Sequence, residues 1–395
     1  MKTTIQEING AFVATLDGRL DTAVAAQTQQ ELQPLFEHSQ SDVVLDCSRL
    51  QYISSSGLRI FLALAKRCPK LRITEVNSDV YQVLEMTGFT KIMNVQRGMR
   101  CLSVDGCEVI GHGGVGIVYR LDADTIIKVF RKGTTLDEVR TEITMAKEAF
   151  VLGMPTAISF DIVRVGQQLG LVYELLRADT LSACLRREPQ RVDELARLYA
   201  NLFRQLHSIR VPRGKTIPDA LVRERESVQH IRRYFDAEGI DILLRVIDAI
   251  PACDRLLHCD LQTKNAMLQG DELMLIDMGE VGYGHPVIDL AHSYSAMMTL
   301  VGDYETIIGV SKELAQDIWQ RMIRYYFEGQ PQHVIDHRLE QIKAVSTVRK
   351  FSWLSLSDSF PDEVIRQCQQ IFEEQVTRQK EHLLEVCGTL NDWEV

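Results

Sequence analysis

The feature that most constrains this chain is a set of polar residues with defined spacing in its second half. His258, Asp260 and Asn265 follow an apolar segment in the order H-x-D-x-x-x-x-N, and Asp277 and Gly279 follow another as D-x-G. Phosphoryl transfer needs a carboxylate near the attacking hydroxyl and oxygen ligands that hold magnesium against the phosphates. The pattern therefore predicts Asp260 as the catalytic residue and Asn265 with Asp277 as magnesium ligands. His258 is expected to orient its neighbours through hydrogen bonds rather than to carry a proton.

A glycine-rich turn lies further upstream. Gly111, Gly113 and Gly116 fall in a G-x-G-x-x-G-x-V pattern between two strand-like segments. Glycine lets backbone N–H groups approach a phosphate closely, although a plain glycine-rich hairpin has the same pattern. A dinucleotide-binding turn would open a helix. Here the strand-like segment IVYRL follows, which favours a hairpin over phosphates.

Lys128 lies in the apolar segment TIIKVF, so its stem should be buried and its ammonium directed at a specific partner. In phosphoryl-transfer sites such a lysine binds the α- and β-phosphates and is positioned by a carboxylate. The helix expected over about 136–150 offers Glu138, Glu142 and Glu148. We expect Glu142 to pair with Lys128, with Glu138 as the alternative. An outward-facing lysine and a solvated acidic helix face are the competing interpretations.

The pattern of strands and helices changes near residue 100. Before it, strand-like segments and helices alternate, which predicts a small α/β layer fold. After it, strand-like segments dominate to about residue 177, and the rest of the chain is mostly helical. We therefore expect one domain over 1–98 and a second over 104–395. The second would consist of an N-lobe over about 104–177 and a C-lobe over about 178–395.

The composition restricts the classes of partner. The formal net charge is -10 at pH 7, which argues against a nucleic-acid or anionic-membrane surface. The sequence contains neither a signal-peptide pattern nor an apolar run of about 18 residues, so we expect no membrane span. The nine cysteines are scattered and form no CxxC pair, which favours reduced thiols over disulfides or a zinc site. Together these features predict a cytoplasmic protein.

Residues from about 105 to 395 resemble the protein-kinase-like superfamily, specifically its aminoglycoside phosphotransferase and choline kinase branch. The resemblance implies an α+β bilobal fold with ATP and magnesium between the lobes and the backbone near Glu174 and Leu175 as an adenine hinge. Three features favour the small-molecule branch. Cys259 replaces the arginine of H-R-D, Gln262 replaces a usual lysine, and no A-P-E segment follows Asp277.

The first domain resembles the STAS fold, which is shared by sulfate transporters and anti-sigma factor antagonists. The resemblance rests on the strand VVLDCS and on Ser54-Ser55-Ser56-Gly57-Leu58. In that family the residue after a usual aspartate is a phosphorylated serine, which maps to Ser55, and Ser54 stands at the aspartate position. A phosphate at a helix N-terminus would meet free N–H groups and the positive end of the dipole. A plain helix cap by Ser54 or Ser55 is the alternative.

The leading prediction is an ATP- and magnesium-dependent phosphotransferase that phosphorylates a hydroxyl of a small molecule, with the STAS domain as a regulatory or docking module. The alternative is a signalling or binding protein whose kinase-like domain is a nucleotide switch or phosphorylates Ser55 or a partner protein. The acceptor should be bound by the helical region after about 290. Asp358, Asp362 and Glu363 could meet a cationic acceptor, although a solvated acidic face is the favoured interpretation.

Overall fold

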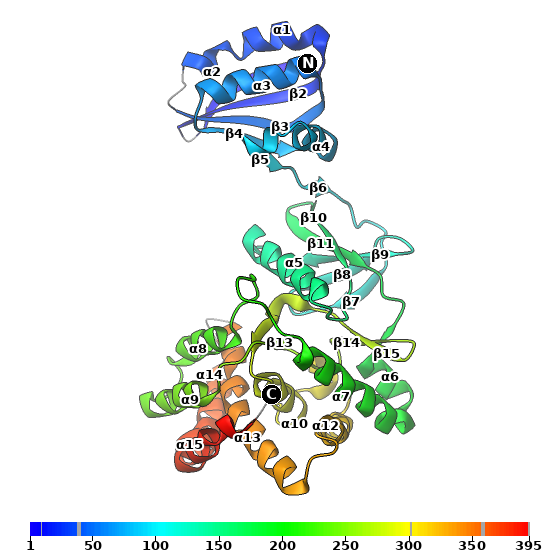
Figure 1. Ribbon diagram of the computed structural model, residues 1–395, viewed down its shortest axis with the longest axis vertical. Helices are drawn as coiled ribbons and strands as arrows, with labels where there is room; N and C mark the ends of the chain where they lie inside the picture. Colours follow the sequence, from blue (N-terminus) through cyan, green and yellow to red (C-terminus); the bar gives the residue numbers. More distant parts are fainter. Residues whose placement is uncertain (9, 38–40, 301, 357–359, 394–395) are drawn as a thin grey trace. The chain divides into compact units, whose positions relative to one another are not determined.

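The computed structural model describes residues 1–8, 10–37, 41–300, 302–356 and 360–393 (Figure 1). The chain divides into two compact units. The first comprises Met1–Asp105 with Ile162–Gly170, and the second comprises Gly106–Asp161 with Leu171–Val395. Within the described residues, no helix combines the length and apolar character that crossing a bilayer requires.

The first unit is built on a five-stranded sheet with the order β1-β2-β3-β4-β5. The strands are β1 (Lys2–Ile8), β2 (Ala11–Leu20), β3 (Asp42–Ile53), β4 (Leu71–Val76) and β5 (Asn94–Arg97), and a short β6 (Arg100–Cys101) follows. β1 and β2 are antiparallel, whereas β2 to β5 are parallel neighbours. The crossovers that parallel strands need contain α1 (Thr22–Glu31), α2 (Gln33–Glu37), α3 (Ser55–Arg67) and α4 (Ser78–Met86). The expected α/β fold is confirmed.

The core of the first unit follows from the spacing of its apolar residues. Along β3, Val43, Leu45 and Cys47 are buried, and the residues between them are partly exposed. Along α3, Phe61 and Leu64 are fully buried at helical spacing. α1 packs beside α3 over this core (Figure 1).

The second unit begins with a strand-rich part. β7 (Val109–His112), β8 (Gly116–Arg120) and β9 (Thr125–Phe130) are antiparallel neighbours. β10 (Ser159–Val165) and β11 (Gln168–Glu174) continue this sheet, so that neighbouring strands follow the order β10-β11-β9-β8-β7. Parts of both strands fall within Ile162–Gly170 of the first unit. α5 (Leu136–Val151) begins at a capping box, in which the side chains of Thr135 and Glu138 each accept the other's backbone N–H.

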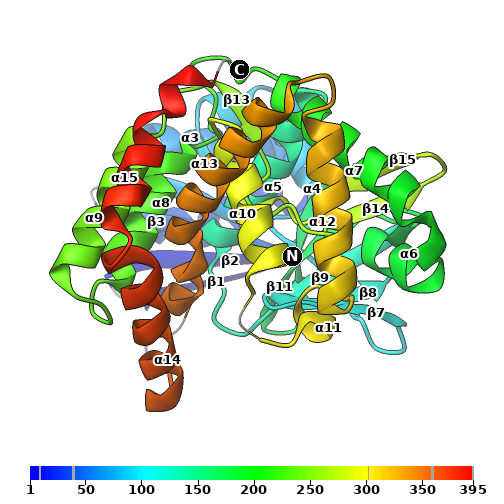
Figure 2. The same ribbon diagram turned by 90° about the horizontal axis from the view of Figure 1, so that it is seen from below.

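The rest of the second unit is mostly helical. Its helices are α6 (Leu181–Arg187), α7 (Val192–Ser208), α8 (Ala220–Ile231), α9 (Ala237–Ala249), α10 (Val287–Met298), α11 (Tyr304–Ile307), α12 (Lys312–Tyr326), α13 (Gln332–Lys350), α14 (Asp362–Phe372) and α15 (Lys380–Gly388). α10 lies beside α13 and α12 (Figure 2). Short antiparallel strands pair as β13 (Arg255–Leu257) with β16 (Gly282–Gly284), and as β12 (Asp179–Thr180), β14 (Ala266–Gln269) and β15 (Glu272–Leu275). A strand-rich part followed by a helical part confirms the expected α+β kinase-like architecture.

Candidate active site

The loop between β13 and β14 is held by one buried carboxylate. Asp289, near the start of α10, accepts the N–H of His258 at 2.9 Å and that of Cys259 at 2.6 Å. Burial would raise the pKa of Asp289, but the ring of His207 at 3.3 Å and the N–H of His258 hold that pKa below its ordinary value. Cys259 has a φ of 61°, which is costly for a side chain with a Cβ. Asp289 therefore stabilises the turn that presents Asp260.

His258 joins the ends of two strands. Its Nδ1 accepts the N–H of Asp260 at 3.3 Å, so its Nε2 carries the proton and donates to the carbonyl of Ile276 at 3.1 Å. The ring is fully buried. With both nitrogens occupied, His258 can orient Asp260 and the segment that leads to Asp277, which is the orienting role expected from the sequence.

Asp260 lies among groups that fix its carboxylate. The Asn265 amide donates to Asp260 Oδ2 at 3.0 Å and to the Asp260 carbonyl at 2.8 Å. Gln262 Nε2 lies 3.4 Å from both carboxylate oxygens. Burial raises the pKa of Asp260, and the positive charge of Arg349 opposes this shift. A positioned carboxylate with a raised pKa is suited to accept a proton from a hydroxyl.

The structure brings Lys128, Glu142 and Asp277 together. Lys128 Nζ lies 2.9 Å from Glu142 Oε1 and 3.0 Å from Asp277 Oδ1, and the Tyr173 hydroxyl donates to Glu142 Oε1 at 2.7 Å. Burial would lower the pKa of Lys128, but Asp277 and Glu142 raise it above its ordinary value. Lys128 therefore remains charged. Glu138 does not take part, because its carboxylate caps α5.

Asn265 and Asp277 offer oxygens of the kind that magnesium prefers. The nitrogen of the Asn265 amide is used by Asp260, so its carbonyl oxygen is the atom left for a cation. Asp277 Oδ1 is used by Lys128, and the side chain is 42% exposed, which leaves Oδ2 accessible. The donor set therefore fits a magnesium ion next to the lysine that would bind phosphates.

The glycine turn is the hairpin between β7 and β8, closed by the Gly113 N–H on the Gly116 carbonyl at 2.9 Å. A Cβ on Gly116 would lie 2.3 Å from the Val129 carbonyl, so packing on β9 requires glycine there. A Cβ on Gly111 or Gly113 would meet atoms at 3.6 or 3.5 Å, and one on Gly114 would meet none within 4 Å. Nothing in the fold requires glycine at these three positions. Their open backbone fits a ligand that must approach closely, such as a phosphate.

The structure restricts how the expected adenine hinge at Glu174 and Leu175 could act, and the hinge itself stays a prediction. The N–H of Glu174 donates to the carbonyl of Ile158 at 2.9 Å, and that of Leu175 donates to the carbonyl of Asp124 at 2.8 Å. Neither amide is free to donate to a base. These bonds come from Asp124 in the turn before β9 and from Ile158 just before β10, and they could not be read from the local sequence.

A cavity of about 630 Å³ opens beside Asp260, and we call it the Asp260 cavity. Its walls come from α8, α10, the end of α13 and the turn that follows, and include Arg223, Arg349 and Trp353. The wall from α8 lies before residue 290, outside the helical region that was expected to bind the acceptor. Asp362 and Glu363 do not line the cavity, and Asp358 lies outside the described residues.

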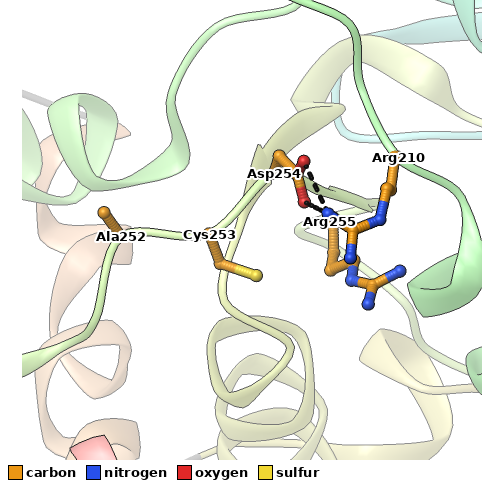
Figure 3. A pocket seen from close by; sticks show the side chains of 5 residues that line it. All are labelled: Arg210, Ala252, Cys253, Asp254 and Arg255. Carbon is orange, nitrogen blue, oxygen red and sulfur yellow. Dashed lines mark hydrogen bonds and ion pairs between the residues drawn. The ribbon is translucent and has the colours of Figure 1, made fainter. Parts of the chain in front are cut away.

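A second hollow, of about 410 Å³, lies around Cys253 (Figure 3). Arg210 and Asp254 line it and form an ion pair at 3.1 Å. It shares no residue with the Asp260 cavity. It contains none of the residues that the sequence connected with phosphoryl transfer.

One buried trio also has the composition of a metal site. Cys259, Asp289 and His292 bring potential ligand atoms within 4.8 Å of one another. However, His292 Nδ1 contacts the Cys259 carbonyl at 2.7 Å and its Nε2 contacts Glu224 at 3.0 Å. Burial raises the pKa of the Cys259 thiol, which keeps it protonated. Because the ring and Asp289 are already used, this trio supports the loop rather than a metal ion.

In the first unit, Ser54 and Ser55 have different environments. Ser54 is buried and is the N-cap of α3, where its hydroxyl accepts the Gly57 N–H at 3.3 Å. Ser55 is exposed at the first position of the helix. A Cβ on Gly57 would lie 2.8 Å from side-chain atoms of Ile53 and Leu20, which explains the glycine. Of the two caps left open by the sequence, the structure therefore uses Ser54.

Comparison with known proteins found two family models that match separate parts of the chain. Residues 107–322 match the phosphotransferase enzyme family, and residues 2–100 match the STAS domain. A putative anti-sigma factor antagonist, BtrV, of Bordetella bronchiseptica is 37% identical over 99 residues, which cover 24% of this chain and 85% of that protein. An anti-sigma F factor antagonist of Paenibacillus polymyxa is 25% identical over 100 residues, covering 24% of this chain and 86% of that protein.

Solved structures similar to this chain include two kinds of kinase. A choline/ethanolamine kinase family protein from Mesorhizobium loti is 16% identical, with a TM-score of 0.48, and covers 72% of this chain and 92% of its own. An ADP-bound aminoglycoside phosphotransferase is 13% identical, with a TM-score of 0.44, and covers 72% of this chain and 93% of its own.

Proposed function

Because this chain belongs to the phosphotransferase enzyme family and carries a STAS domain at residues 2–100, we propose that it is an ATP- and magnesium-dependent kinase for a hydroxyl of a small molecule. The catalytic domain would extend over 104–395 and follow a STAS domain over 1–98. The observation that carries the proposal is the contact of Lys128 with both Glu142 and Asp277. In this arrangement the Lys128 ammonium is placed to bind phosphates, and the Asp277 carboxylate is placed to bind a metal ion.

The nucleotide end of the site is formed by Lys128 and the glycine turn. Lys128 binds the α- and β-phosphates, while Glu142 and Tyr173 keep its ammonium in place. The backbone N–H of Gly114 approaches the phosphates, because no side chain blocks it. Asn265 and Asp277 would hold magnesium through their oxygens. Magnesium, when bound, neutralises charge on the phosphates.

The acceptor end of the site is formed by Asp260. Its carboxylate orients the acceptor hydroxyl towards the γ-phosphate and takes up the hydroxyl proton. The acceptor oxygen forms a bond to the γ-phosphorus as the bond to the oxygen that bridges the β- and γ-phosphates breaks, and ADP leaves with that oxygen. Asn265 and Gln262 hold the carboxylate in the lining of the Asp260 cavity. His258 and Asp289 keep the loop in shape.

A second candidate function is phosphorylation of Ser55 or a partner protein, with the STAS domain as a regulatory or docking module. The observation that favours it is that Ser55 is exposed and is not the N-cap of α3. Intact mass after incubation with ATP and magnesium distinguishes the two functions. A gain of one phosphate that Ser55→Ala removes supports the second. ADP release that depends on an added small-molecule hydroxyl, without mass gain, supports the first.

A further inference from the structure

The charges around the Asp260 cavity bear on the kind of acceptor it takes. Asp260, Glu226 and Glu280 contribute negative charge to its lining, and Arg223, Arg349 and Lys350 contribute positive charge. An acceptor bound here meets whichever of these groups is not already neutralised by a neighbour. The contacts of each group therefore decide which charge is available.

Two of the three cations are already engaged. Arg223 lies 3.1 Å from Glu280 Oε2 and also donates to the Glu280 carbonyl, so this pair is neutralised within the wall. Lys350 donates to the side-chain oxygen of Gln375 at 2.6 Å. Neither group needs a ligand to complete its contacts.

Arg349 is different. Among the described residues it donates no hydrogen bond, and the nearest carboxylate oxygen, Glu224 Oε1, lies 4.0 Å away. The same Glu224 oxygen is only 3.0 Å from His292 Nε2. Burial would lower the pKa of Arg349, but Glu224, Glu280 and Asp260 raise it, so the guanidinium is charged. Its side chain is 24% exposed and lines the cavity.

The acids near Arg349 have closer partners of their own. Glu280 is paired with Arg223, Glu224 with His292, and Asp260 accepts hydrogen bonds from Asn265 and Gln262. A partly buried guanidinium with unused donors is a strong site for a planar or tetrahedral oxyanion. Lys350, whose partner Gln375 is uncharged, adds positive charge in the same wall. A polycationic acceptor would be repelled at this point.

We propose that the acceptor is a small hydroxylated anion whose carboxylate or phosphate group binds Arg349 while its hydroxyl reaches Asp260. The proposal rests on the proposed kinase function and adds the chemical class of its substrate. Leu300, Ile307 and Trp353 form an apolar part of the wall, which suits the carbon skeleton of such a molecule. The volume of about 630 Å³ fits a small metabolite.

The test uses the full chain with saturating MgADP, so that the phosphate-binding groups of the nucleotide end are filled. Thermal unfolding, followed by tryptophan fluorescence, is measured against glycerate, glycerol 3-phosphate, glycerol and choline. These probes share a hydroxyl and differ in charge, and the first two separate carboxylate from phosphate recognition. We expect one or both anions to raise the Tm, because a ligand that binds the folded state stabilises it.

Arg349→Gln should increase the half-maximal concentration of the stabilising anion by about tenfold or more. Arg225→Gln is the matched control, because Arg225 of α8 pairs with Asp248 of α9 at 2.6 Å and does not line the cavity. It should leave that concentration unchanged. Arg349→Lys keeps the charge and should recover part of the affinity, and it replaces the glutamine variant if the latter does not fold.

The proposal is wrong if no anion stabilises the wild type more than it stabilises Arg349→Gln, or if choline or glycerol stabilises it equally well. It is also wrong if Arg349→Gln weakens MgADP binding as much as anion binding, because Arg349 would then serve the nucleotide.

ATP turnover tests the kinase function separately. If the wild type and Arg349→Gln phosphorylate a cationic or neutral acceptor at the same rate, the proposed acceptor class is wrong and the kinase function stands. Anion binding at Arg349 without any Asp260-dependent turnover rejects the kinase function alone.

Discussion

The Cys259 N–H lies 2.6 Å from Asp289 Oδ1, and this contact joins the start of α10 to the loop that carries Asp260. The carboxylate is fully buried and also accepts the His258 N–H. Its role is to hold a strained backbone, since Cys259 has a positive φ. The active-site loop therefore depends on a residue about 30 positions further along the chain.

Removing that charge should destabilise the second unit. Asp289→Asn keeps the size of the side chain but loses charge-assisted hydrogen bonds to two N–H groups, and we expect a loss of about 2 kcal/mol or more in the free energy of unfolding. Urea unfolding followed by tryptophan fluorescence measures it. Asp254→Asn, at a half-exposed ion pair, is the control and should cost less than about 1 kcal/mol. Equal costs for the two variants would contradict the anchoring role.

Two glutamates on α5 provide a matched pair. Glu142→Gln removes the charge beside Lys128, so we expect kcat/KM for ATP to fall by about 100-fold. Glu138→Gln changes only the capping box and should lower stability slightly, with little change in turnover. Steady-state ADP release measures both variants. A similar loss of activity in the two would show that Glu142 has no special role.

Stability should depend on pH through His285. Burial lowers the pKa of His285 from 6.5 to about 4. The unfolded chain therefore binds a proton at a higher pH than the folded chain does. The stability contributed by the neutral ring is fully present above pH 6.5 and is lost as the pH falls towards 4.

Urea unfolding at pH 7.5 and pH 5 checks this prediction. About 2 kcal/mol of the contribution should be lost by pH 5. Tryptophan fluorescence is a suitable signal, because Trp393 lies 5.3 Å from the His285 ring. His285→Asn should reduce the difference between the two pH values by that amount. An unchanged difference in the variant would assign the pH dependence to other groups.

Ser54 and Ser55 of the STAS domain should differ in how much each contributes to the stability of the first unit. Ser54→Ala removes the N-cap of α3 and should lower the stability of the first unit by about 1 kcal/mol. Ser55→Ala should change stability little, since its side chain is exposed. Circular dichroism during denaturation measures both. A larger effect of Ser55→Ala would mean that the cap has been assigned to the wrong serine.

Much of the site could be predicted because its parts are local patterns. The spacing between His258 and Asn265 describes one loop, and the apolar residues around Lys128 describe one strand. Glu138 and Glu142 are four residues apart and share one helix face, so the helix pattern alone does not separate them. The structure pairs Glu142 with Lys128 at 2.9 Å and uses Glu138 in the capping box. The α/β and bilobal architectures follow from the same local alternation of apolar residues.

Other features depend on contacts that are distant in sequence. β1 has a mostly exposed face with polar residues, so its pattern alone does not identify a strand, and pairing with β2 defines it. The amides of Glu174 and Leu175 are used by Ile158 and Asp124. Arg349 belongs to none of the sequence motifs described above. The packing of α13 against α10 and α8 places it in the lining of the Asp260 cavity.

The most direct test of the central claim is phosphoryl transfer to small hydroxylated acceptors by the full chain and by Asp260→Asn, with ATP and magnesium. The account predicts acceptor-dependent ADP release and a phosphorylated product from the wild type. It predicts a loss of at least about 100-fold in kcat for Asp260→Asn, with MgADP binding retained. Turnover by Asp260→Asn at the wild-type rate would contradict the account.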